Sequence, residues 1–259
     1  TEDADRARPA GDWLRLFELA RRHDVPGDPR TLERARAGVR DARVMPECRR
    51  RFMQMLDNPV GLGDLLRALH QVGLLGRIIP PFEHLRCLIQ FNQYHKFTVD
   101  EHTLRAVDAA ARRFDQHDAI GTAYRRIRRK DLLHLAILLH DVGKGYDVDH
   151  AAKGAELADV VARDLGLGEH DRELVVFLVR EQLLMAHTAQ RRDIADPQTI
   201  RQLAPAARTP DPPRAPLRLT AAYPAAVAPR NLTTWKETLL VQLYTGTLQA
   251  LTGESPADD

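Results

Sequence analysis

Apolar residues recur along most of this chain at the three- and four-residue spacing of amphipathic α-helices. Trp13, Leu16, Phe17 and Ala20, for example, fall on one face of the segment 12–22. The alternation of β-branched and polar residues that marks half-buried strands is scarce. We therefore predict an all-α fold, with helices at residues 12–22, 29–40, 46–55, 62–72, 99–113, 131–142, 151–164, 170–184, 196–203 and 233–251.

Local signals predict several of the helix ends. Asp28-Pro29 is typical of an N-cap followed by a first helical residue. Residues 98–101 (TVDE) match a capping box, with Thr98 as N-cap and Glu101 three residues later. Residues 74–81 (LLGRIIPP) are predicted to form a turn, because their prolines stop a helix. Prolines also crowd residues 204–230, which excludes a continuous helix there.

The most distinctive pattern is an almost wholly apolar run at residues 132–139 (LLHLAILL), followed by His140-Asp141. The run carries no charge, so we expect a helix that is buried on all sides. A carboxylate at the end of such a helix must be neutralised, paired or bound to metal, because an isolated buried charge is too costly. Other His-Asp pairs occur at 23, 117 and 170, but only this one precedes a Gly-Lys turn, Gly143-Lys144.

Composition limits the classes of protein to consider. A chain of 259 residues can form one large domain or two small ones. Its net charge of +2 makes no global electrostatic case for binding nucleic acid or membranes, and no apolar run approaches the ~18 residues of a membrane span. The two cysteines, Cys48 and Cys87, show no metal or redox spacing and favour a cytoplasmic setting. The first residue is Thr, which is compatible with a piece of a longer protein.

Candidate metal ligands are spread over several predicted helices: His102, His140, His150 and His187, with Asp141 and then Asp147, Asp149 and Asp193. Neutral imidazole plus carboxylate suits Zn, Fe or Mn, and the helices of a bundle can bring such ligands together. A single histidine on a helix is more often a surface or core residue than a ligand. His134, inside the apolar run, is expected to hydrogen-bond within the core.

A buried ion pair or a helix cap is the simpler explanation of His140-Asp141. Lys144 favours a functional site, because a lysine after a glycine turn suits an anionic group held beside a metal. Arg191 and Arg192 could add to this positive charge, or they could form an ordinary solvated pair in a loop.

The motif H-D-x-G-K after a buried helix, with an earlier histidine, resembles the HD superfamily of metal-dependent phosphohydrolases. Longer strings resemble one family within it, the bifunctional protein-PII uridylyltransferase/uridylyl-removing enzymes. These strings are residues 94–103 (YHKFTVDEHT), 139–145 (LHDVGKG), 149–150 (DH), 154–156 (GAE), 183–194 (LLMAHTAQRRDI) and 196–197 (DP). Together with a later helix around Trp235, the resemblance runs from about Leu62 to Tyr244.

The resemblance implies an HD-domain helical bundle with an N-terminal helical extension. We place the extension at residues 1–81, the HD domain at 82–251 and a disordered tail at 252–259. The implied reaction is hydrolysis of the phosphodiester that joins UMP to a tyrosine of a PII signalling protein, which is part of nitrogen regulation. Expected partners are therefore a PII-like protein or a nucleotide.

The same resemblance implies roles for individual residues. His102, His140 and Asp141 would be metal ligands, and His150 would belong to an extended ligand set, around a divalent Mn, Fe, Zn or Mg ion. In metal-assisted hydrolysis Asp141 would also orient the reacting groups, and Lys144 with Arg191 or Arg192 would bind phosphate and neutralise its charge. His95 is a candidate proton donor to the leaving group.

Two positions depart from the family's pattern. Gln182 stands where the family usually carries a histidine, and Tyr223 stands where the family has the aspartate that is the last HD ligand. Loss of that carboxylate predicts weaker metal binding, for which His187 or Asp193 could compensate. Two functions stay open: a phosphohydrolase, or a catalytically degenerate HD domain that binds a nucleotide or partner and signals. A plain helical scaffold would require the matching strings to be an accident.

Overall fold

The computed structural model describes residues 9–25, 28–89, 97–117, 119–125 and 127–180 of the chain, and within these ranges it contains helices and no strand. The predicted all-α fold is confirmed for this part. The helices predicted at 196–203 and 233–251, the proline-rich segment and the tail lie outside the described residues. No helix in the described ranges is both long and apolar enough to cross a membrane.

The helices follow one another with short connections. They are α1 (Ala10–Arg22), α2 (Pro29–Val39), α3 (Pro46–Asp57), α4 (Leu62–Gln71), α5 (Leu74–Ile78), α6 (Pro80–Glu83), α7 (Val99–Arg112), the 3-10 helix η2 (Arg113–Asp115), α8 (Ala119–Arg125), α9 (Lys130–Leu139), α10 (His150–Asp164) and α11 (Glu169–Arg180).

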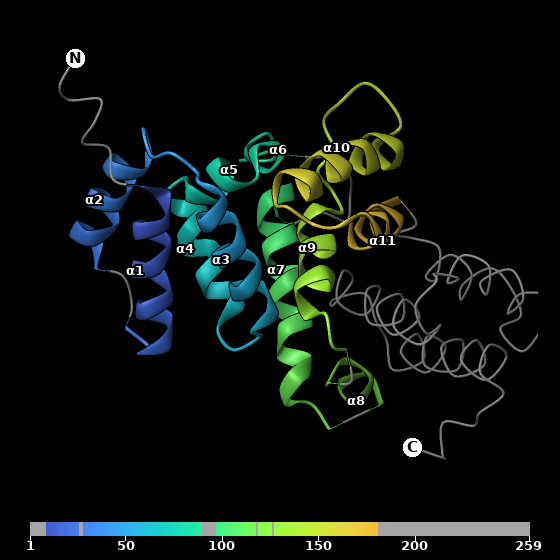
Figure 1. The fold of residues 1–259 in the computed structure, drawn as a ribbon, viewed down its shortest axis with the longest axis horizontal. Helices are drawn as coiled ribbons and strands as arrows, with labels where there is room; N and C mark the ends of the chain where they lie inside the picture. Colours follow the sequence, from blue (N-terminus) through green and yellow to red (C-terminus); the bar gives the residue numbers. More distant parts are fainter. Residues whose placement is uncertain (1–8, 26–27, 90–96, 118, 126, 181–259) are drawn as a thin grey trace, which may run out of the picture.

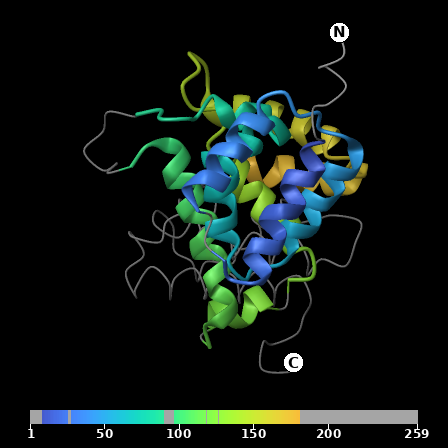
Figure 2. The ribbon, with the colours of Figure 1, turned by 90° about the vertical axis from the view of Figure 1, so that its left-hand side faces the viewer.

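Helix α9 is the central element of this arrangement. It contacts α7, α3 and α11, while α4 packs on α7 and α10 packs on α11. In Figure 1, α1 to α4 gather on one side of the α7–α9 pair and α10 and α11 lie on the other. Figure 2 looks onto the N-terminal helices, with α10 and α11 behind them. A helix enclosed in this way has no solvent face, which explains why the run at 132–139 is apolar all round.

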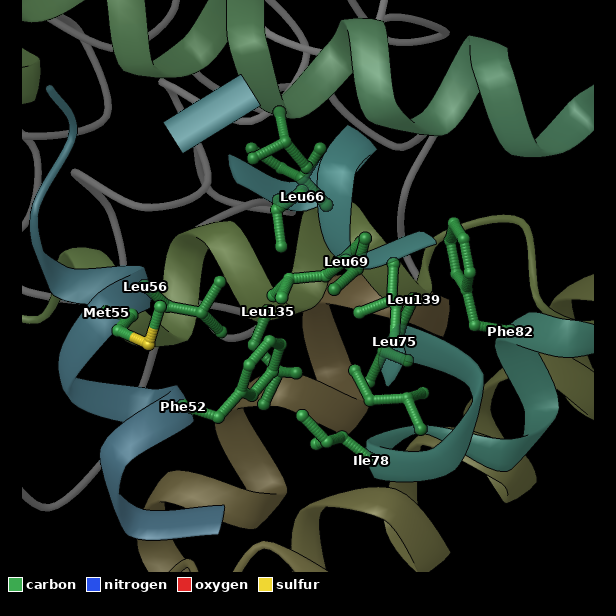
Figure 3. Close-up of a cluster of buried hydrophobic side chains, with 14 of the residues drawn as sticks. Phe52, Met55, Leu56, Leu66, Leu69, Leu75, Ile78, Phe82, Leu135 and Leu139 are labelled. Atoms are coloured by element: carbon green, nitrogen blue, oxygen red, sulfur yellow. The ribbon is translucent and has the colours of Figure 1, made fainter. Parts of the chain in front are cut away.

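One continuous apolar core joins the helices on both sides of residue 81. Phe52 and Leu56 of α3, Leu69 of α4 and Leu135 and Leu139 of α9 meet in its middle (Figure 3). Burial of each such side chain stabilises the fold by about 1.5–3 kcal/mol. The domain boundary that we placed at residue 81 stays a prediction.

Several predicted helix ends are confirmed. The Asp28 carboxylate accepts hydrogen bonds from the backbone N–H groups of Arg30 (3.0 Å) and Thr31 (3.1 Å), and Pro29 is the first residue of α2. Gly73 follows the end of α4 with a φ of +82°, a conformation that costs glycine little. These ends are specified by neighbours in the chain, which is why the sequence predicts them.

Two local predictions are wrong. Residues 74–81 contain the short helices α5 and α6 rather than a turn, because Leu74, Leu75 and Ile78 bury one helical face and Pro80 is tolerated at the start of a helix. The capping box does not form either: the Thr98 side chain makes no cap hydrogen bond to α7.

Candidate metal centre

The His140-Asp141 pair lies where α9 ends. Residues 132–139 of α9 are all buried, and His140 is the C-cap residue of the helix. A chain of tight turns follows, in which the backbone N–H of Val142 donates to Leu139 and that of Lys144 donates to the Asp141 carbonyl at 2.9 Å. The turns hold the His140 and Asp141 side chains inside the protein, with 2% and 3% of their surfaces exposed.

His102 reaches the same place from α7. The His102 and His140 ring centroids lie 5.6 Å apart, with an interplanar angle of 62°. Together with Asp141 they form a group whose possible ligand atoms all lie within 4.8 Å of one another. The prediction that these three residues converge on one point is therefore confirmed, while their role as metal ligands stays a prediction.

The hydrogen bonding of His140 indicates which ring nitrogen could bind a metal. Its Nδ1 lies 2.7 Å from the Ile137 carbonyl oxygen, which only accepts, so Nδ1 carries the proton. In the neutral ring the lone pair is then on Nε2. That atom is buried and makes no hydrogen bond within the described residues.

The unpartnered Nε2 lies 3.1 Å from Oδ2 of Asp141. Two lone-pair atoms at this distance repel each other unless a cation lies between or beside them. Metal–ligand bonds of ~2 Å place neighbouring ligand atoms roughly 3 Å apart. Two imidazoles and a carboxylate in this arrangement therefore fit a divalent transition metal.

Lys144 provides the positive charge closest to Asp141. Its Nζ donates to Asp141 Oδ2 at 2.8 Å, and the lysine side chain is only 14% exposed. Burial alone would raise the pKa of the Asp141 carboxyl, but the neighbouring His140 and Lys144 outweigh it and hold this pKa below its usual value. Asp141 is therefore an anion at neutral pH, as a metal ligand must be.

Other predicted site residues lie apart from this group. His150 is the exposed first residue of α10 and does not belong to the cluster of ligand atoms. Asp149 instead caps α10, where it accepts a hydrogen bond from the Ala151 N–H at 3.0 Å, and Asp147 is exposed in the preceding loop. The assignment of His150 to an extended ligand set stays a prediction.

The remaining candidates fall outside the described residues: His95, Gln182, His187, Arg191, Arg192, Asp193 and Tyr223. Their assignments as proton donor, phosphate ligands, substituted ligands or compensating ligands therefore stay predictions.

Sequence reasoning missed two features that shape this site. Gly143 lies against α10, and a Cβ atom there would overlap the His150 carbonyl oxygen and the backbone nitrogen of Gly154. The glycine of the H-D-x-G-K motif thus permits a close backbone approach. The second feature is a buried pair of His70 on α4 and Asp100 on α7; its signal in the sequence is a histidine on the apolar face of the helix at 62–72.

Comparison with known proteins agrees with this geometry. The HD domain family matches residues 99–216. The bifunctional uridylyltransferase/uridylyl-removing enzyme of Zymomonas mobilis is 35% identical over 250 residues, which are 92% of this chain and 27% of that protein. The enzyme of the same name from Gluconobacter oxydans is 35% identical over 255 residues, 93% of this chain and 27% of the relative.

A third relative, from Azospirillum brasilense, carries the same name and is 33% identical over 254 residues. This chain spans about 27% of the length of these curated relatives. The match includes His102, His140 and Asp141, and the structure brings these three residues together. The chain belongs to the HD-domain family, and it is homologous to the HD region of bifunctional uridylyltransferase/uridylyl-removing enzymes.

Proposed function

We propose that this protein is a metal-dependent phosphohydrolase that removes uridylyl groups from a PII-like signalling protein in the cytoplasm. The observation that carries the proposal is the buried, unpartnered Nε2 of His140, 3.1 Å from the Asp141 carboxylate and beside His102. The name of the relatives, uridylyl-removing enzyme, supports the choice of substrate.

The proposed reaction breaks the bond between phosphorus and the tyrosine oxygen. Water supplies the hydroxyl that joins phosphorus, UMP departs, and the tyrosine oxygen leaves with a proton. A divalent metal held by His102, His140 and Asp141 would supply Lewis acidity toward the phosphate and toward water. Asp141 would keep the two imidazoles oriented, since its carboxylate is fixed by burial and by Lys144.

Lys144 has a second task in this proposal. In the structure its ammonium group neutralises Asp141, at the edge of a cluster in which His102 is 28% exposed. A phosphate that enters from this open side would meet the lysine, whose point charge would offset the negative charge that develops on the phosphoryl oxygens. From the sequence, Arg191 or Arg192 would assist it and His95 would protonate the leaving tyrosine oxygen.

A catalytically degenerate HD domain is the second candidate. Tyr223 and Gln182 favour it, since both stand where the family's pattern has stronger ligands. Such a domain would retain the fold and bind a nucleotide or a partner, but would not turn over.

Metal analysis of the full chain tests the proposal, with Asp141→Ala compared with Asp147→Ala. Asp147 is a matched control because it is an exposed carboxylate in the loop just after the cluster. We expect wild type and Asp147→Ala to retain divalent metal and to release UMP from a uridylylated PII-type protein. Asp141→Ala should lose both while its helices persist in circular dichroism.

Each alternative outcome has a defined meaning. Full metal occupancy in Asp141→Ala contradicts the ligand assignment. Metal retention by wild type without release of UMP, or of p-nitrophenol from a model phosphodiester, favours the degenerate domain. If Asp141→Ala instead loses ~3–5 kcal/mol of stability in a protein that never held metal, Asp141 belongs to a structural ion pair.

A further inference from the structure

A second cavity lies at the opposite end of α9 from the metal centre. It has a volume of about 640 Å³ and is formed by α3, the residues that lead into α9, and the turn between α10 and α11. Asp131 in the first turn of α9 lines the cavity, and the metal cluster begins nine residues later at His140. At a rise of 1.5 Å per helical residue, the two sites are roughly 13 Å apart.

Two basic segments that are distant in the sequence meet at this cavity. Residues 49–51 (RRR) in α3 contribute Arg49 and Arg50, and residues 125–130 (RRIRRK) contribute Arg128 and Arg129. The volume is within the usual range for small-molecule sites, roughly 300–1,000 Å³. Neither the cavity nor its arginines take part in the proposed phosphohydrolase site.

Two of these arginines already have acidic partners. Arg50 lies 3.9 Å from the exposed carboxylate of Glu47. Arg129 donates two hydrogen bonds to Asp131, at 3.0 and 2.9 Å, and a third to Asp171 at 2.7 Å. Asp131 and Asp171 are therefore already occupied by a cation, and together with Arg129 they define a fixed, nearly neutral wall of the cavity.

The other wall carries unsatisfied charge. Arg49 and Arg128 form no ion pair with any residue that the structure describes, and Nε of Arg49 is a buried atom without a hydrogen-bond partner there. Leaving a buried donor unsatisfied costs about 1–3 kcal/mol. A guanidinium group aligns best with phosphate or carboxylate oxygens, to which it donates in pairs.

Two carboxylates share the lining with these arginines. Asp57 at the end of α3 and Asp164 at the end of α10 line the cavity, and neither has an ion-pair partner within the described ranges. Carboxylates repel a bare phosphate but accept hydrogen bonds from hydroxyl groups. The combination therefore favours a ligand that joins an anionic group to hydroxyl donors.

We propose that this cavity binds a small phosphorylated sugar, the portion that all nucleotides share. Its phosphate would pair with Arg49 and Arg128, and its hydroxyl groups would donate to Asp57 and Asp164. The site is independent of the metal centre, so the proposal stands whether or not the protein hydrolyses uridylyl-tyrosine.

Calorimetric titration of the metal-free full chain with ribose 5-phosphate, ribose and inorganic phosphate tests the proposal. We expect ribose 5-phosphate to bind, inorganic phosphate to bind at least about tenfold more weakly, and ribose to give no measurable heat. UMP should bind at this site like ribose 5-phosphate, which distinguishes a general sugar-phosphate site from one that admits no base.

Variants localise the binding. Arg128→Gln and Arg49→Gln should each weaken ribose 5-phosphate binding by at least about tenfold, as expected for loss of a charge-assisted pair. Asp57→Asn should weaken ribose 5-phosphate but not inorganic phosphate. Arg15→Gln, which changes an exposed arginine of α1, and Asp141→Ala, at the metal centre, should leave the affinity unchanged.

Three results would overturn the proposal. One is the absence of any heat with ribose 5-phosphate up to roughly 1 mM, the weak end of specific affinities. Another is equal affinity for ribose 5-phosphate and inorganic phosphate, which would indicate nonspecific anion binding. The third is loss of binding in Asp141→Ala together with retention in Arg128→Gln, which would place the ligand at the metal centre.

Discussion

His70 and Asp100 form a buried pair, with His70 Nε2 and Asp100 Oδ2 3.0 Å apart, that joins α4 to the first turn of α7. The same carboxylate accepts the backbone N–H of Cys87 at 3.1 Å, and Arg86 donates to the His70 carbonyl at 2.9 Å. Burial would raise the pKa of Asp100, but hydrogen bonds from Thr98, Cys87 and His70 outweigh it and lower this pKa. The pair therefore fixes the start of the helix that carries His102 two residues later.

Replacement of His70 should disturb both stability and the metal cluster. We expect His70→Ala to cost about 1–3 kcal/mol of unfolding free energy, because a buried carboxylate loses a hydrogen-bond donor. It should also weaken metal binding, measured by competition with a chelating dye, whereas His70→Gln should recover much of the affinity through its amide N–H.

Leu14→Ala is the control for this comparison. It removes a fully buried side chain of α1 and should cost about 2–5 kcal/mol without altering metal affinity. Equal metal affinities in His70→Ala, His70→Gln and wild type would show that the pair has only a structural role.

Gly143 should not tolerate even a methyl group. Because a Cβ atom would overlap backbone atoms of His150 and Gly154, Gly143→Ala must displace the start of α10 from the motif turn. We expect a loss of about 1–3 kcal/mol in urea unfolding, typical of overpacking. Gly168→Ala is the matched control, since no atom lies within 4 Å of its added Cβ. Equal stability of the two variants would contradict the close approach of the two backbone segments.

His134 should make stability depend on pH. Its ring is fully buried between the Leu56 carbonyl and the Tyr124 hydroxyl, as the sequence predicted for a core histidine. Burial lowers its pKa from 6.5 to about 4. On acidification the unfolded chain takes up a proton before the folded one does, so stability falls as the pH drops below about 6.5 and is greatest above it.

The expected loss from this histidine is roughly 1.5 kcal/mol between about pH 6.5 and pH 5, from the difference in pKa between the two states. Urea unfolding of the metal-free protein at several pH values measures it. His134→Gln should flatten this part of the profile, and an unchanged slope in the variant would assign the pH dependence to other groups.

Tyr223→Asp tests the departure from the family's pattern. A phenol with an ordinary pKa near ~10 is a poor anionic ligand at neutral pH, so we expect wild type to bind metal weakly and turn over slowly. The aspartate should raise both metal affinity and hydrolysis of uridylyl-tyrosine, tested with Mn, Fe and Zn because the ligand set does not choose among them.

Fast turnover by wild type would show that another residue supplies the missing ligand, and His187 and Asp193 are the first to replace. No gain in metal or activity with an unchanged fold would favour the degenerate domain.

The sequence by itself determined the features that depend on neighbours in the chain. The period of apolar residues predicted α1 to α4, the Asp28-Pro29 start of α2 and the buried character of α9, because helix faces and caps depend on residues up to four positions apart. The H-D-x-G-K motif and the longer strings likewise identified the family from contiguous residues. His134 was placed in the core for the same reason, as a member of an apolar run.

Only the tertiary structure decided which side chains meet across helices. The contact of Lys144 with Asp141, the exposure of His150 and the pairing of His70 with Asp100 depend on how α4, α7, α9 and α10 cross. The failed capping box and the helices at 74–83 have the same origin: Thr98 and Asp100 bond to each other, and Leu74 and Leu75 gain more from burial in the core than the nearby prolines cost. Packing angles and helix register are set by the whole core, so a local pattern does not encode them.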